Sequence, residues 1–129
     1  MTAKTAALII GVIFIIAGIL GFIDNPIIGN SDEAIFHADT VHSIVHIVSG
    51  VLFLLFALAA PGAAAGFLKF FGIVYLLIGV IGFVQYGTSG MGKVLGFLHV
   101  NGADNFLHVA LGIVIFIAGF LKPRVVATT

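Results

Sequence analysis

The sequence contains few charged residues and no cysteine. Only 8 % of its 129 residues are charged, and five acidic residues balance five basic ones. Ordinary soluble domains carry about 25 % charged residues, so ten formal charges are too few to cover a water-soluble protein of this size. The neutral net charge also argues against nucleic-acid binding. The absence of cysteine excludes disulfides, thiolate metal ligands and iron–sulfur clusters.

Hydrophobic residues are abundant instead, at 61 % of the chain. A transmembrane helix needs about 17–25 mainly apolar residues. Two of the four apolar stretches reach that length if their polar first turns, 40–43 and 102–105, lie in the membrane interface. Membrane β-strands would alternate apolar and polar residues, and these stretches do not. We therefore predict an all-α bundle of four transmembrane helices, surrounded by membrane lipids, in a single domain over residues 1–129. The apolar stretches are about 6–23, 44–60, 67–84 and 106–121.

The two halves of the chain resemble each other. Residues 35–61 align without a gap on residues 97–123, and residues 8–24 align on residues 69–85. We predict two tandem parallel two-helix repeats, about 8–61 and about 69–123, related by a pseudo-two-fold axis along the membrane normal. The identities fall on residue types with specific backbone or polar roles. They include His37 with His99, His46 with His108, Gly50 with Gly112, Pro61 with Pro123, Gly11 with Gly72 and Gly18 with Gly79.

The basic residues indicate an orientation. Four predicted spans place both termini and the 61–68 connection on one side, which holds four basic residues and no acidic one. The loops 24–39 and 86–101 lie on the other side, where Lys93 is the only base. Short cytoplasmic loops are enriched in Lys and Arg, so we expect cytoplasmic termini and external loops. The four basic residues are Lys4, Lys69, Lys122 and Arg124.

Helix caps and packing positions are also visible. Asp39 and Asn101 occupy equivalent positions and make good N-caps, and Asp104 then lies at the third helical position, where a carboxylate is favourable. Small residues recur seven apart, one pair on each predicted helix. That spacing suits close left-handed packing of membrane helices. The pairs are Gly11 and Gly18, Gly50 and Ala57, Gly72 and Gly79, and Gly112 and Gly119.

Histidines gather near the external ends of two predicted helices. His42 and His46 share a face with the packing residue Gly50, and Asp104 and His108 occupy the matching face of the last helix. These polar residues therefore point into the bundle, where ionisable groups are functional candidates. His37 and His99 precede the caps and lie in the interface above them.

Four interpretations of this cluster remain open. The imidazoles can hydrogen-bond loop carbonyls, Asn105, Ser43 or each other and hold the loops on the bundle. A second interpretation is a divalent-cation site, because an i, i+4 histidine pair is good ligand spacing. A third is a haem or chlorophyll-type pigment on His46 and His108, and a fourth is a proton relay or substrate path. The apolar segments 51–60 and 113–121 disfavour a channel or pump. The second interpretation uses His42, His46, Asp104 and His108.

A family resemblance covers essentially the whole chain. The string HVNGADNFLHVALG (99–112) resembles the hallmark of a bacterial family of small four-helix membrane proteins, the domain of unknown function 4383 type. The first-half string FHADTVHSIVHIVSG (36–50) resembles that family's matching motif, in which a histidine precedes a His-x-x-x-His pair, here His37, His42 and His46. Ser43 departs from the Asn seen at position 105. The resemblance implies a fold and a bacterial cytoplasmic membrane location, but no established activity.

The remaining chemistry predicts no enzyme. The serines have no nucleophile–base–oxyanion arrangement, and the glycines of 87–92 do not form a nucleotide-binding phosphate loop. We therefore expect a non-enzymatic, multi-pass accessory or structural protein that associates with itself or with other membrane subunits. The alternative is a metal-, haem- or pigment-binding protein that uses the His/Asp cluster.

Overall fold

Four helices account for most of the chain in the computed structural model, which describes residues 1–122. Pro123 and Arg124, used above for the repeat and the orientation, lie outside the described residues. Three helical segments are long and apolar enough to cross a membrane, namely α1, α2 and the joined η1–α3, whereas α4 has 17 residues. The mostly helical architecture agrees with the all-α prediction. The helices are α1 (Ala3–Leu20), α2 (Thr40–Ala59), the 3-10 turn η1 (Pro61–Ala63), α3 (Ala64–Tyr86) and α4 (Gly102–Ala118).

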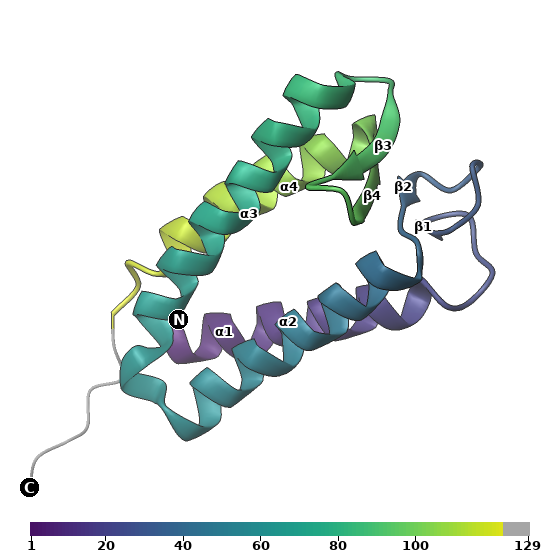
Figure 1. Cartoon of the computed structure of the whole chain (residues 1–129). Coiled ribbons are helices and arrows are strands. Elements are labelled where there is room, and N and C mark those ends of the chain that lie inside the picture. The colour runs from purple at the N-terminus through teal and green to yellow at the C-terminus, as the bar shows by residue number, and fades with distance from the viewer. Residues whose placement is uncertain (123–129) are drawn as a thin grey trace, which may run out of the picture.

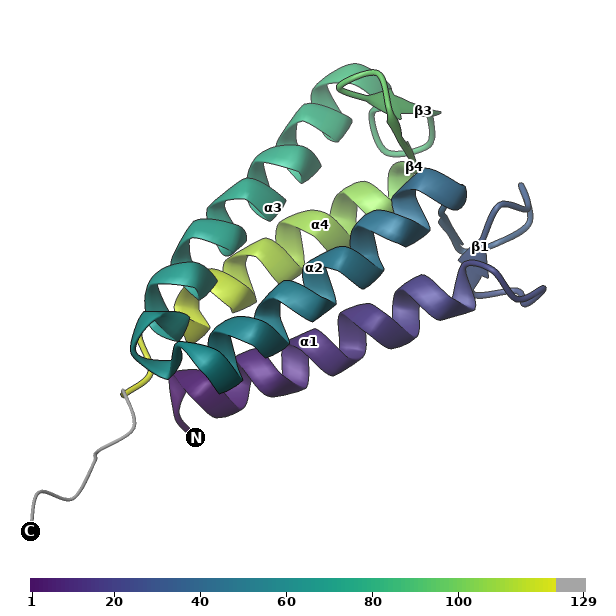
Figure 2. The same cartoon turned by 60° about the horizontal axis from the view of Figure 1, so that its bottom comes forward.

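The helices pack as two consecutive pairs. Helix α1 runs along α2, and α3 runs along α4 (Figures 1 and 2). The two pairs lie close together near η1 and diverge toward the end that carries the strands (Figure 1). The start of α1 and the end of α4 meet at the η1 end, where the Ala3 amide donates to the Lys122 carbonyl over 3.3 Å. The wide end of the molecule is thus the one that can enclose a site.

Glycines allow the backbones within each pair to approach closely. A Cβ atom added at Gly50 would lie 2.6 Å from the carbonyl oxygen of Gly11, and one added at Gly72 would lie 2.9 Å from that of Gly112. Real Cβ atoms essentially never lie this close to a backbone atom, so a larger residue at either position would force the helices apart. The other small residues of the seven-residue pattern are also placed against a partner helix. Gly18 faces α2, Gly79 faces α4, Gly119 faces α3, and Ala57 is fully buried.

The loops between α1 and α2 and between α3 and α4 contain short strands, which were not predicted from the sequence. Strand β1 (Ile28–Gly29) pairs in parallel with β2 (Phe36–His37), and β3 (Met91–Val94) forms an antiparallel hairpin with β4 (Leu98–Asn101). The hairpin turns at Leu95 and Gly96, with φ of 55° and 81°, a backbone conformation typical of tight hairpins. Its buried side chains, Val94, Leu98 and Val100, pack on Val45, Ile78, Ile81 and Tyr86.

The core lies between the two helix pairs, and the outward faces are apolar. Phe14, Phe53, Leu68, Tyr75 and Ile115 are among its buried members. Many large apolar side chains point outward from the helices. Apolar side chains thus occupy both the core and the outer surface. This distribution matches a helix bundle surrounded by hydrocarbon, where apolar surface need not be buried.

Candidate functional site

The N-terminal caps of α2 and α4 position the histidines that follow them. Asp39 is the N-cap of α2, and its Oδ1 accepts a hydrogen bond from the His42 amide over 2.9 Å. Asn101 is the N-cap of α4 and forms a capping box with Asp104. The Asp104 amide donates to Asn101 Oδ1 over 3.0 Å, and the Asn101 amide donates to Asp104 Oδ2 over 2.8 Å. The Asp104 carboxylate is therefore engaged at the start of its own helix.

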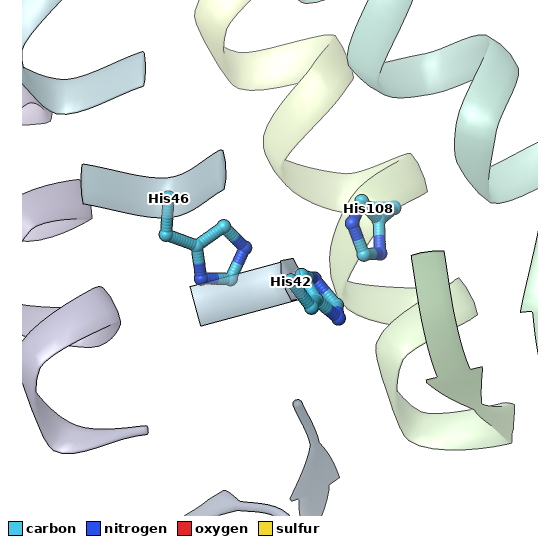
Figure 3. Close-up of side chains that lie close together, drawn as sticks. All are labelled: His42, His46 and His108. Atoms are coloured by element: carbon cyan, nitrogen blue, oxygen red, sulfur yellow. The ribbon is translucent and has the colours of Figure 1, made fainter. Parts of the chain in front are cut away.

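Three histidines meet inside the wide end of the bundle. His42 and His46 come from α2, one turn apart, and His108 comes from α4 (Figure 3). One ring nitrogen from each lies within 4.8 Å of the others, and all three side chains are buried. Within residues 1–122 this is the one group of three or more metal-ligating side chains at such spacing, and Asp104 is not a member of it.

Backbone carbonyls fix the ring orientation of two of these histidines. His42 Nδ1 lies 2.8 Å from the carbonyl oxygen of His99, and His108 Nδ1 lies 2.6 Å from that of Asp104. A carbonyl oxygen only accepts, so each Nδ1 carries the proton in the neutral ring and each Nε2 has a free lone pair. Metal-ligating histidines are usually oriented by this kind of outer hydrogen bond.

His46 is held less tightly. Its Nε2 lies 3.5 Å from the Tyr75 hydroxyl, and its Nδ1 has no hydrogen-bond partner among the described residues. Buried polar atoms are nearly always paired. The unpaired ring nitrogen of His46 is therefore available to bind a metal ion or another partner. The sequence analysis overlooked Tyr75. Its position in the sequence could have identified it. Tyr75 lies three residues after Gly72 and four before Gly79, so its hydroxyl is on the helix face that these glycines mark for packing.

The two polar side chains expected from the sequence as imidazole partners, Asn105 and Ser43, make no hydrogen bond to a histidine among the described residues. Asn105 donates through Nδ2 to the carbonyl of Gly87 over 3.2 Å, and the Ser43 hydroxyl has no hydrogen-bond partner among the described residues. The purely structural interpretation named these two residues, loop carbonyls and the other histidines as imidazole partners. Two of those contacts are present, because His42 bonds the His99 carbonyl and His37 bonds His99. Backbone carbonyls fill that role for His42 and His108, and nothing equivalent does so for His46.

Aromatic side chains and two cavities surround the cluster. The Tyr75 ring lies 4.4 Å from the His108 ring, and the Phe14 ring lies 5.6 Å from the His46 ring, measured between centroids. A cavity of about 100 Å³ is lined by all three histidines. A second, partly open cavity of about 250 Å³ lies on the α1–α4 side and shares His46, Tyr75 and His108 with the first. The cluster thus lies between these two cavities.

The histidines before the caps form a pair of their own. His37 Nε2 lies 2.7 Å from His99 Nδ1, and the rings are 4.1 Å apart between centroids. His37 lies on β2 and is buried, whereas His99 lies on β4 and is half-buried. Burial lowers the pKa of His99 below its ordinary value of 6.5, and the neighbouring His37 lowers it further. The pair joins the two loops that carry the strands.

Comparison with known proteins identifies one family. The model of a domain of unknown function (DUF4383) matches residues 4–121. This match confirms the resemblance that the two histidine-containing strings carry. No curated protein and no solved structure matches the chain.

Proposed function

The chain belongs to the DUF4383 family of domains of unknown function, and from this premise we propose that it is an integral membrane protein that binds a divalent transition-metal ion. The site consists of His42, His46 and His108. The observation that carries the proposal is the convergence of three buried imidazole nitrogens within 4.8 Å. Imidazole nitrogen suits zinc, copper, nickel and iron, and three histidines are a known set of protein ligands for zinc.

The hydrogen bonds around the cluster favour an ion over a purely structural role. His42 and His108 donate through Nδ1, so their Nε2 lone pairs are not used in these hydrogen bonds and can bind an ion. Three neutral imidazoles with free lone pairs in a buried space gain a common partner when they bind a cation. Zinc–nitrogen bonds of about 2.0–2.1 Å place the nitrogens of a tetrahedral site roughly 3.3 Å apart. The imidazoles would close onto the ion by small side-chain rotations.

The size of the cavities favours a bare ion over a haem or chlorophyll-type ring. The cavities beside the cluster measure about 100 and about 250 Å³. Pockets that bury drug-sized ligands measure roughly 300–1,000 Å³, and a macrocycle is larger than such ligands. Asp104 is left out of the ligand set because its carboxylate completes the capping box.

We also propose four membrane spans in two tandem repeats. Equivalent residues of the two halves meet at the centre, as residues close to a two-fold axis do. Phe14 and Tyr75 are 5.3 Å apart between ring centroids, and His37 contacts His99. Helix α4 is the shortest span, and turns through residues 119–121 extend it. The basic residues Lys4, Lys69 and Lys122 favour cytoplasmic termini in the bacterial cytoplasmic membrane, with the strands and the histidines on the external side.

The first test is metal analysis combined with an absorption spectrum on protein purified gently in detergent. We expect about one zinc, copper, nickel or iron ion per chain and no visible haem or chlorophyll band. His46→Ala and His108→Ala should each abolish the stoichiometric metal. Ser49→Ala is the matched control, because Ser49 lies on the same helix one turn below His46 and is buried. Equal metal content in the histidine variants and the parent would refute the site. An intense Soret band would show that the site binds a haem-type ring instead of a bare ion.

An accessory role in a larger membrane assembly remains a proposal alongside metal binding. Its support is the apolar surface on the outer faces of the helices, which includes Leu58, Phe70 and Val84. Such surfaces contact lipid, neighbouring subunits or a second copy of the chain. Co-purification with a larger complex or a homo-oligomer in mild detergent would support this role. A protein that elutes as a lone chain after chemical cross-linking in membranes would contradict it.

A further inference from the structure

A tetrahedral ion held by three histidines keeps one coordination position for another ligand. Protein sites with three ligands and an open position are the type at which exogenous molecules bind zinc. In this chain His46 and His108 line both cavities, so the larger cavity adjoins the proposed site as well as the smaller one. This inference rests on the metal site proposed above.

The larger cavity has the character of a binding site for a small apolar molecule. Its walls include Ile13 and Ala17 of α1 and Leu107 and Leu111 of α4. Its polar residues are His46, Tyr75, His108 and Asp104, of which the two histidines belong to the cluster. A volume of about 250 Å³ exceeds the roughly 150 Å³ of an apolar protein cavity that accommodates benzene.

The cavity also indicates how such a molecule would arrive. Ile13 belongs to its lining, yet 53 % of this side chain is exposed on the outer surface of α1. In the membrane topology proposed above, that surface faces the hydrocarbon of the bilayer. A ligand that partitions into lipid can therefore reach the cavity sideways between α1 and α4.

Charge selects among lipid-soluble ligands. The apolar walls disfavour any ionised ligand, because burial of an unpaired charge is costly. We propose that the cavity binds a small, uncharged, mainly apolar molecule whose single nitrogen or oxygen donor occupies the open position of the metal ion.

The test uses cobalt(II) as the metal and 4-methylpyridine as the probe. Cobalt(II) replaces zinc in such sites, and its visible absorption changes when a fourth ligand binds. We expect a saturable spectral change with 4-methylpyridine and at least a tenfold weaker response to pyridine-4-carboxylate, which adds a negative charge at the same ring position. Measurements on full-length protein in detergent and in lipid bilayer discs should agree.

Two variants locate the probe. Ala17→Phe should fill the cavity and weaken probe binding at least tenfold while cobalt still binds one per chain. Ala110→Phe is the matched control, since Ala110 is exposed on the outer face of α4 and should change neither property. If Ala17→Phe does not fold, the smaller substitution Ala17→Leu is used to fill the cavity instead.

The possible results separate the two proposals. No cobalt binding would refute the metal site and this inference with it. Stoichiometric cobalt with no response to 4-methylpyridine, or an equal response in a folded Ala17 variant, would overturn the ligand cavity and leave the metal site standing. Equal binding of the charged and uncharged pyridines would refute the selection for a neutral ligand.

Discussion

His37 Nε2 and His99 Nδ1 lie 2.7 Å apart and connect the loop that follows α1 with the hairpin that follows α3. The carbonyl of the same His99 accepts the hydrogen bond from His42 Nδ1 over 2.8 Å. One residue thus contacts both the opposite loop and the proposed metal site. The two halves of the chain are joined directly above the three buried histidines.

Loss of either imidazole from this pair should destabilise the protein. His37→Ala and His99→Ala each leave a partly buried ring without its partner, at a cost of about 1–3 kcal/mol in the free energy of unfolding. Unfolding by SDS in mixed micelles measures this cost. Lys93→Ala is the control, because Lys93 is exposed on the neighbouring strand β3. A double variant as unstable as the sum of the two single variants would contradict a direct interaction.

The stability of the metal-free protein should fall in mild acid. Burial holds the pKa of folded His99 below its ordinary value of 6.5, so the unfolded chain takes up this proton first. The stabilising contribution of neutral His99 is complete above pH 6.5 and decreases as the pH falls from 6.5 toward the lowered folded pKa. His99→Gln removes the titrating group, and its unfolding free energy should depend less steeply on pH. Equal slopes for parent and variant would refute this assignment.

Asp104→Ala should affect stability but not metal stoichiometry. The change removes the capping-box acceptor for the Asn101 amide, and loss of such a cap costs about 0.5–2 kcal/mol. Thermal unfolding and metal analysis of the same sample check both expectations. Asp39→Ala, which removes the N-cap of α2, provides a comparison of similar chemistry. Loss of the metal in Asp104→Ala, with the helices intact, would return this carboxylate to the ligand set.

Enlarging the packing glycines should separate the helices within each pair. Gly50→Val and Gly72→Val place side-chain atoms within 3 Å of backbone atoms of the partner helix, and overpacking of this kind costs about 1–3 kcal/mol. Gly66→Val is the control, since a Cβ at Gly66 meets nothing within 4 Å. Melting temperatures in one detergent suffice for the comparison. If all three variants had the same melting temperature, close packing at Gly50 and Gly72 would not limit stability.

Features encoded by neighbouring residues could be predicted from the sequence. The apolar stretches predicted helices near their observed positions, and Asp39, Asn101 and Asp104 are found at the helix starts. Capping depends on contacts only three residues apart, so the local order of residues is sufficient. The family resemblance likewise depends on motifs that can be read directly along the chain.

The strands were not predicted because their stability comes from other elements. The apolar side chains of the hairpin are Val94, Leu98 and Val100, which are buried only because α2 and α3 supply the surface beneath them. Over four-residue strands, alternation of apolar side chains is a weak signal. The turn at Leu95 also places a non-glycine residue at positive φ, which a sequence seldom reveals.

The sequence by itself determined that the chain forms apolar helices and carries histidines near their capped ends. Tertiary structure alone decided which of those histidines meet. Helix periodicity places His42 and His46 on one face, but only the packing of the α1–α2 pair against the α3–α4 pair brings His108 and Tyr75 beside them. It also placed the His99 carbonyl where it accepts the hydrogen bond from His42. These relationships join residues up to 66 positions apart, from His42 to His108, and such contacts depend on how whole helices pack rather than on any local preference of the chain.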